Sequence, residues 1–248
     1  MAGPVTDGAP VSIVIPVLDE AAALPRLARH LSILDPPPAE VIVVDGGSSD
    51  GTPELAREFG FRVVDHDRGR ARQINRGVAE AAADLVVVLH ADTLLPDDAI
   101  AVVRRTFADR RVALAGFTPV IEGPERVRWA TTFHNWIKTW YGPLLGRPHL
   151  FLRGARLLFG DHAMFFRRAD FLAVSGMDEG HAVMEEADLC AKMVALGRVR
   201  LVNRIVRTSD RRIAHWGEWH ANRIYLSVGL RWAAGLRARL GDDYPDVR

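Results

Sequence analysis

Three short segments of the chain place carboxylates directly after apolar runs. They are residues 16–20 (PVLDE), 43–52 (VVDGGSSDGT) and 89–92 (LHAD). Carboxylates there can hydrogen-bond a base and sugar hydroxyls, a terminal aspartate can hold a metal ion, and the glycines let a ligand approach the backbone closely. Each acid alone could equally cap the helix that follows it, since the helix dipole and free N–H groups favour a carboxylate. Three such segments at one sheet edge favour a binding site.

The apolar runs have the composition of strands buried on both faces of a parallel sheet. Helical spacing follows them, as where Leu24, Leu27 and Leu31 fall on one face. Strands alternating with short helices predict right-handed βαβ units, and hence an α/β fold with a doubly wound, mostly parallel sheet and helices on both faces. Ligands bind at the carboxyl ends of the strands in such sheets. The predicted strands are residues 11–18, 40–45, 61–66 and 84–92, and the predicted helices are residues 20–34, 52–60 and 71–83.

The second part of the chain is less regular. Beyond Leu114 the pattern weakens, and residues 128–166 are rich in Trp, Phe, Leu and Arg without one clear period, which predicts helices and loops. Helical spacing returns in residues 169–174 and 186–196, and residues 198–206 read as one late strand or two short ones. The C-terminal part is amphipathic, with arginines interspersed.

Composition excludes several classes of protein. The formal net charge of the 248 residues is +1, so no global field attracts nucleic acid or an anionic membrane. The single Cys190 excludes an intramolecular disulfide framework, and no apolar run is long enough to span a bilayer. We therefore expect a cytoplasmic protein. The C-terminal helix fits peripheral membrane contact and a homodimer interface equally well.

Five ordered motifs carry a family resemblance. The chain resembles family 2 glycosyltransferases, which have the nucleotide-sugar-binding GT-A fold, and it is especially similar to the selenodomain-associated transferase subgroup. The resemblance covers residues 11–212 and rests on VSIVIPVLDE, EVIVVDGGSSDGT, GRARQINRGVAEAAADLVVVLHAD, GDHAMFFRRADFLAVSGMDE and MEEADLCAKMVALG. It implies one GT-A domain at residues 11–222 and a C-terminal amphipathic helix at residues 223–248. Residues 11–115 would be its nucleotide-binding half and residues 116–222 its helical, acceptor-side half.

The resemblance implies how a donor nucleotide would bind. Pro16, Asp19 and Glu20 would line the ribose and base, and Asp45 would contact the base edge. Arg72 would contact the nucleotide, with Arg70 as a weaker candidate, because a guanidinium matches phosphate oxygens. Either arginine could instead pair with a surface acid.

The family's D-x-D motif corresponds to His90, Ala91 and Asp92. Its last aspartate would bind a divalent cation, Mn or Mg, that bridges the donor diphosphate, since hard cations prefer oxygen ligands. His90 departs from the usual aspartate, which lowers the local negative charge. Its side chain could simply hydrogen-bond a ribose hydroxyl or a backbone carbonyl.

The resemblance also places groups that act on the reaction. Glu186 stands where the family has its catalytic aspartate and would accept the proton of the acceptor hydroxyl, with Glu185 as the second candidate. The alternative is that both are solvated acids at the start of a helix. Arg211 and Arg212 would neutralise the departing diphosphate. His215 would be a further metal ligand or a base-facing side chain, although a lone His beside Trp is more often structural.

The implied activity is an inverting, metal-dependent transfer of a sugar from a nucleoside-diphosphate sugar, with UDP favoured over GDP, to a hydroxyl acceptor. This chain departs from the family pattern at two positions, with His90 in place of the first aspartate of D-x-D and Glu186 in place of the catalytic aspartate. A nucleotide-sugar-binding protein with weak or lost catalysis is therefore the alternative. A nucleotidyltransferase is disfavoured, because the chain lacks the glycine-rich basic loop of those enzymes.

Overall fold

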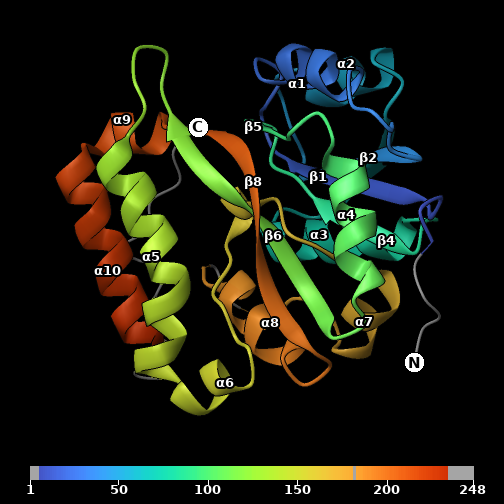
Figure 1. The fold of residues 1–248 in the computed structure, drawn as a ribbon. Helices are drawn as coiled ribbons and strands as arrows, with labels where there is room; N and C mark the ends of the chain where they lie inside the picture. Colours follow the sequence, from blue (N-terminus) through green and yellow to red (C-terminus); the bar gives the residue numbers. More distant parts are fainter. Residues whose placement is uncertain (1–5, 181–182, 234–248) are drawn as a thin grey trace.

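One mixed sheet of eight strands organises the molecule. The computed structural model describes residues 6–180 and 183–233, and its strands lie in the order β3-β2-β1-β4-β7-β6-β8-β5 (Figure 1). Within the described residues, no helix is both long and apolar enough to cross a membrane.

The first half of the chain follows the predicted alternation closely. Strand β1 pairs in parallel with β2 and β4, and β2 pairs in parallel with β3. In this register Val17 lies opposite Asp45, so the acidic tails of β1 and β2 leave the sheet side by side. The elements are β1 (Val11–Val17), α1 (Leu24–Leu31), β2 (Glu40–Asp45), α2 (Thr52–Glu58), β3 (Arg62–Asp65), α3 (Arg70–Glu80) and β4 (Leu85–Val88).

The second half adds antiparallel pairs. Strand β7 lies antiparallel between β4 and β6, while β6 and β8 pair in parallel over most of their length. The short β5 pairs antiparallel with β8. The elements are β5 (Thr93–Leu94), α4 (Ala99–Ala108), β6 (Val112–Glu122), α5 (Trp129–Gly146), α6 (Pro148–Leu152), the 3-10 turn η1 (Gly160–His162), β7 (Phe165–Arg167), α7 (Arg168–Ala173), α8 (Glu185–Met193), β8 (Arg198–Ser209), α9 (Arg211–Trp216) and α10 (Glu218–Ala233).

Several boundaries differ from the sequence predictions. The strand predicted at 84–92 ends at Val88, so the LHAD segment is a loop rather than the end of a strand. The late strand is a single element that continues to Ser209, because it has β6 and β5 as partners on its two edges. The predicted C-terminal helix at 223–248 begins earlier, at Glu218, and residues 234–248 lie outside the described part.

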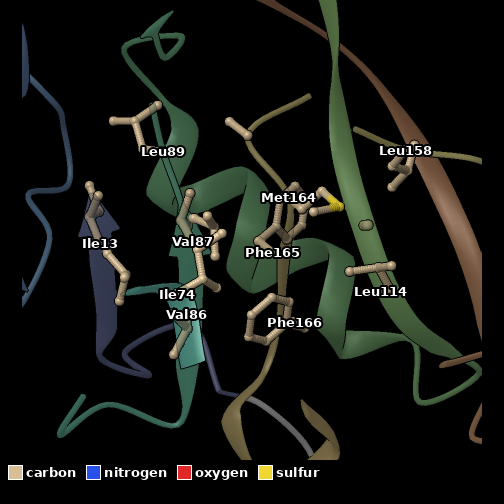
Figure 2. Packing of buried hydrophobic residues seen from close by; sticks show 14 of the residues in the cluster. Ile13, Ile74, Val86, Val87, Leu89, Leu114, Leu158, Met164, Phe165 and Phe166 are labelled. Carbon is tan, nitrogen blue, oxygen red and sulfur yellow. The ribbon is translucent and has the colours of Figure 1, made fainter. Parts of the chain in front are cut away.

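One large hydrophobic core joins the two halves. Val86 and Val87 of β4 lie beside Phe165 and Phe166 of β7, and all four side chains are buried (Figure 2). Helix α3 packs on the same sheet through Ile74. The core therefore holds the strand tails on a rigid support.

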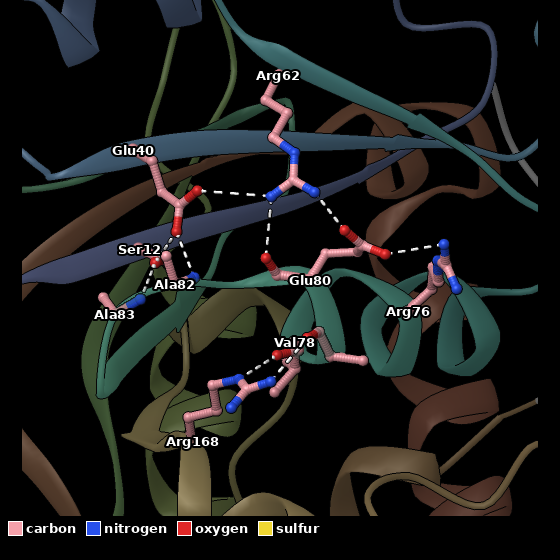
Figure 3. Close-up of polar contacts among 10 residues, drawn as sticks. Ser12, Glu40, Arg62, Arg76, Val78, Glu80, Ala82, Ala83 and Arg168 are labelled. Carbon is pink, nitrogen blue, oxygen red and sulfur yellow. Dashed lines mark hydrogen bonds and ion pairs between the residues drawn. The ribbon is translucent and has the colours of Figure 1, made fainter.

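A polar network fixes the edge of the sheet opposite the acidic tails (Figure 3). Glu40, at the start of β2, accepts hydrogen bonds from the Ser12 hydroxyl at 2.6 Å and from the Ala82 N–H at 2.7 Å. Arg62 binds the Glu80 carboxylate and donates to the Glu80 carbonyl at 2.9 Å. These contacts anchor the C-terminal end of α3, which leaves its N-terminal end, with Arg70, at the edge where the acids lie.

Candidate active site

The tail of β2 is organised around the carboxylate of Asp45. One of its oxygens accepts hydrogen bonds from the N–H groups of Gly47 at 2.9 Å and Ser48 at 3.0 Å. The other accepts from the Ser48 hydroxyl. Gly47 has a φ of +91°, a conformation that side chains rarely adopt, so a glycine is required at this turn. The side chain proposed to contact the base edge therefore also shapes the loop on which the base would lie.

The tails of β1 and β2 are joined by direct hydrogen bonds. The backbone N–H of Asp19 donates to the Ser48 hydroxyl at 2.8 Å, and the Asp19 carboxylate accepts from the Ser49 N–H at 2.8 Å. The Glu20 N–H donates to the Thr52 hydroxyl at 2.9 Å. Asp19 itself has a positive φ of 55°, which its short polar side chain tolerates. The two tails thus form one continuous surface at the carboxyl edge of the sheet.

Arg211 connects this surface to the D-x-D segment. Its guanidinium binds both oxygens of Glu20, at 2.7 and 3.2 Å, and lies 3.7 Å from an oxygen of Asp92. A planar guanidinium is suited to such two-point contacts with carboxylates and phosphates. Arg211 begins α9, so the C-terminal part of the chain reaches the tail of the first strand at this point.

His90 packs against a glycine that leaves room for its ring. A Cβ added at Gly160 would lie 2.2 Å from Cε1 of His90. Nε2 of His90 is buried and has no hydrogen-bond partner among the described residues. Burial lowers the pKa of His90, and the charge of Arg70 acts in the same direction, although the nearby carboxylates oppose it. The ring is therefore a neutral imidazole at neutral pH. Within the described part of the chain, Nε2 of His90 is therefore not hydrogen-bonded to a backbone carbonyl, which was one alternative considered from the sequence.

Glu185 and Glu186 share one arginine. Nη1 of Arg70 lies 3.4 Å from Glu185 and 3.6 Å from Glu186. Burial raises the pKa of Glu185 to about 8, with the negative charge of Glu186 adding to the rise and Arg70 opposing it. The fold therefore favours the protonated form of Glu185. The solvated-acid alternative does not describe this pair, because Glu185 is 1% exposed and Glu186 is 4% exposed.

A cavity of about 490 Å³ brings part of the predicted site together. Of the side chains singled out from the sequence, it is lined by Arg70, His90, Asp92, Glu186, Arg211 and Arg212. The strand-tail residues Asp19 and Asp45 do not line it; they lie beyond Glu20, which Arg211 links to Asp92.

The remaining predicted residues lie outside this cavity. Arg72 is half exposed and lies 3.8 Å from Glu179. This ion pair with a surface acid is the alternative that the sequence analysis gave for this arginine. His215 is exposed on α9, and Pro16 and Ala91 contribute to the strand tail and loop that carry Glu20 and Asp92. Among the described residues no three His, Cys, Asp or Glu side chains are grouped to hold a metal ion.

The sequence reading missed a second polar group in the cavity. Lys138 of α5 lies with its ammonium 3.8 Å from the centre of the Phe159 ring. Asp161 binds Asn135 and also lies 2.9 Å from His162. Although burial opposes it, the neighbouring His162 and Lys138 hold the pKa of Asp161 below its usual value. Asp161 belongs to the quoted GDHAM motif, which was the available signal, whereas nothing in the sequence marked Lys138.

The architecture and the comparisons agree on the class of protein. A mixed sheet with helices around it and acidic strand tails at one edge is the GT-A fold, as in the solved glycosyltransferases that it resembles. The chain belongs to glycosyl transferase family 2, whose family model matches residues 12–172. The fold and family predictions are thereby confirmed. The resemblance to the selenodomain-associated subgroup stays a prediction.

Individual relatives share the family but differ in length. Succinoglycan biosynthesis protein ExoA of Rhizobium meliloti is 34% identical over 194 residues, which cover 71% of this chain and 56% of that protein. The chain spans less than two thirds of the length of the curated relatives that it matches.

Two solved structures show the fold. The mannosyltransferase PcManGT from Pyrobaculum calidifontis, in complex with GDP-Man and Mn²⁺, has a TM-score of 0.67 and 18% identity, covering 97% of this chain and 66% of that one. Glucosyl-3-phosphoglycerate synthase from Mycobacterium tuberculosis, in complex with Mn²⁺, UDP and glucosyl-3-phosphoglycerate, has a TM-score of 0.61 and 21% identity, covering 92% and 81%.

Proposed function

We propose that this protein transfers a sugar, with inversion, from a nucleoside-diphosphate sugar to a hydroxyl acceptor, with UDP as the favoured nucleotide and a divalent cation as cofactor. The observation that carries the proposal is the convergence of His90, Asp92, Glu186 and Arg211 on one cavity, directly beside the joined strand tails. These residues come from three distant parts of the chain, so their convergence is a property of the fold.

The donor would lie along the carboxyl edge of the sheet. Its nucleoside would contact Asp19, Asp45 and the glycine turn, and its diphosphate would reach Arg211 and Arg212. Arg211 now binds Glu20 and lies near Asp92, and phosphate oxygens offer it the same two-point geometry. Asp92 would hold Mn or Mg, which when bound neutralises charge on the diphosphate leaving group. Both solved relatives described above contain Mn²⁺, one with GDP-Man and one with UDP.

Glu186 would accept the acceptor proton. It lines the cavity, whereas Glu185 does not, and burial raises the pKa of Glu185. Arg70 contacts both carboxyl groups. With Glu186 as base and one displacement at the anomeric carbon, the configuration at that carbon inverts.

The test is Glu186→Gln, with nucleotide-sugar binding and nucleotide release measured separately. We expect UDP-sugar binding to persist while turnover falls at least about 100-fold, since a general base contributes roughly 10²–10⁴. Arg57→Gln serves as a control, because this arginine is on the surface of α2. Undiminished turnover in Glu186→Gln would reject Glu186 as the base.

A binding protein with weak or lost catalysis is the second candidate. Its support is the presence of His90 where the family has an aspartate, with a ring that is neutral at neutral pH and so adds no charge to a cation site. Hydrolysis of UDP-glucose or GDP-mannose on addition of Mn would decide for the enzyme. Tight nucleotide binding without any nucleotide release would decide for the binding protein.

A further inference from the structure

The cavity continues beyond the reacting groups into an apolar chamber between α5 and α10. These two helices pack against each other and lie side by side along one flank of the molecule (Figure 1). We define the chamber by six of its side chains: Leu145, Leu157, Phe159, Leu226, Leu230 and Trp232. Glu186 and Asp92 line the same cavity, and we call the part that they line its polar end. The whole cavity, at about 490 Å³, falls within the size range of small-molecule sites.

The chamber opens outward through apolar side chains. Leu145, Leu226 and Leu230 line the cavity and are also 77%, 46% and 60% exposed. A single exposed leucine is ordinary on a protein surface. Three that line the same cavity give it apolar side chains on the solvent side.

Lys138 lies where the chamber meets the polar end. Its ammonium contacts the faces of Phe159 at 3.8 Å and Tyr225 at 5.7 Å, and no hydrogen bond or ion pair joins it to the described residues. An ammonium group has three N–H donors and is stabilised by oxygen acceptors. It lines the same cavity as Glu186. Burial lowers the pKa of Lys138, and the charges of Asp161 and Glu186 oppose this. Its donors are therefore available to oxygens of a bound molecule.

We propose that the acceptor is an amphiphilic hydroxyl compound, whose apolar part occupies this chamber and whose oxygen-bearing head is bound by Lys138 beside Glu186. This inference rests on the proposed function and specifies its acceptor. An apolar chain in the chamber would remove apolar surface from water, and the head would place its hydroxyl near the base. A free sugar would fill only the polar end.

Gly229 provides a way to fill the chamber without disturbing its walls. This glycine of α10 lines the cavity, and a Cβ added there would have no atom within 4 Å. A larger side chain at this position would occupy space that the chain of an acceptor needs. Gly229→Leu is therefore the blocking variant and Gly229→Ala is its matched control.

The experiment measures binding of n-alkyl β-D-glucosides from hexyl to decyl, below their critical micelle concentrations and without donor. For the unaltered protein we expect Kd to fall about fourfold per added methylene, corresponding to ~0.8 kcal/mol, until the chamber is full. Gly229→Ala should keep this dependence and Gly229→Leu should abolish it. Lys138→Met should weaken binding of all glucosides by about tenfold while keeping the dependence on chain length.

Two outcomes would overturn the inference: a Kd that is the same for all chain lengths, or a chain-length dependence that Gly229→Leu leaves intact. Melting temperatures of the variants identify any that fail to fold, and Lys138→Met then gives the second, independent result. Binding of UDP-glucose and GDP-mannose is titrated separately. If neither binds, the proposed function fails even where alkyl chains bind, and the chamber would then not be an acceptor site.

An amphiphilic acceptor of this kind has two sources: it is either a dissolved amphiphile or a lipid in a bilayer. A second arm therefore uses phosphatidylcholine vesicles with and without dodecyl β-D-glucoside. Co-sedimentation only with the glucoside-bearing vesicles, lost in Gly229→Leu, assigns the acceptor to the bilayer. Binding of the monomeric glucosides without co-sedimentation assigns it to solution. Either result supports binding of the acceptor in the apolar chamber, and the absence of both contradicts it.

Discussion

Glu185 and Glu186 are neighbours in the chain with different environments. Glu186 faces the cavity, while Glu185 points into the protein and lies near Arg70. Burial makes the charged form of Glu185 unfavourable, and so does the adjacent carboxylate. A proton retained on Glu185 removes one negative charge beside Glu186. We infer that Glu185 is a positioning residue: because it carries a proton, both carboxyl groups can be buried side by side without two adjacent negative charges.

Replacing Glu185 with glutamine should change how stability depends on pH. The pKa of Glu185 rises from 4.5 to about 8 on folding, so the folded state binds the proton more tightly than the unfolded state does. The associated stability is fully present below about pH 4.5 and is lost as the pH rises through about 8. Glu185→Gln stays neutral, so its free energy of unfolding should decline less between pH 5 and pH 9.

Urea unfolding at pH 5, 7 and 9 measures this effect. Glu54→Gln is the control, since the side chain of Glu54 is 70% exposed and its replacement should leave the pH dependence unchanged. Equal decline of the free energy of unfolding in the Glu185→Gln and unaltered proteins would show that Glu185 is ionised in the folded state.

The contact between His90 and Gly160 predicts a coupled pair of substitutions. Gly160→Ala would place a Cβ 2.2 Å from the His90 ring, which must move. We expect a loss of about 1–3 kcal/mol, the usual cost of overpacking. Adding His90→Ala should recover part of that loss, because the ring that clashes is gone. A double-mutant cycle measures the coupling, and additive effects of the two substitutions would contradict the contact.

Individual residues show where sequence reasoning stops. The order of motifs was enough to single out Asp92 and Glu186, both of which line the cavity. The sequence favoured Arg72 over Arg70 as the nucleotide contact. The two arginines lie two positions apart at the start of α3 and point to different sides of the helix, and only Arg70 lines the cavity. Arg70 contacts the two glutamates and Arg72 contacts Glu179. Only the packing of α3 against the sheet decides between them.

Helix α5 explains why the sequence of residues 128–166 shows no clear hydrophobic period. Its buried positions are largely polar, with Thr131, Asn135 and Thr139 inside, while Trp129 and Phe133 are more than half exposed. This is the reverse of the usual pattern, in which the apolar face is buried. The inner face carries polar groups because it borders Asp161 and the polar part of the cavity. The first half, with β-branched strands and amphipathic helices, follows the rule and was predicted to within a few residues.

Two glycines in helices should respond in opposite directions to alanine. Gly77 lets α3 approach the sheet, since a Cβ there would lie 2.3 Å from Val14 and 2.9 Å from Val44. Gly229 of α10 has open space around its Cβ position. Alanine is the better helix former by about 1 kcal/mol. Gly77→Ala should therefore lower the free energy of unfolding by about 1–3 kcal/mol through overpacking, and Gly229→Ala should raise it by up to about 1 kcal/mol.

Chemical denaturation of the two variants checks this pair. An increase in stability for Gly77→Ala would mean that α3 does not pack as closely on β1 and β2 as the structure shows. A decrease for Gly229→Ala would mean that the open space beside α10 is filled by other atoms in solution.

At the scale of the whole molecule, the two halves share one sheet and one core. Strand β4 of the first half pairs with β7 of the second, and the short β5 pairs with β8. The main hydrophobic cluster extends from Val11 in β1 to Trp232 in α10. Arg211 and Glu20 add a link at the site itself. We therefore expect residues 11–222 to unfold as a single unit, although the sequence suggested two halves of different character.

The distribution of tryptophan allows that expectation to be tested. All six tryptophans lie between residues 129 and 232, so their fluorescence reports on the second half, whereas far-UV circular dichroism reports on the whole chain. Gly77→Ala perturbs only the first half, where α3 meets β1 and β2. If the halves are one cooperative unit, the fluorescence melting temperature should fall together with that from circular dichroism, by about 2–4 °C per kcal/mol. A fluorescence transition that stays in place while the other moves would show that the acceptor-side half unfolds independently.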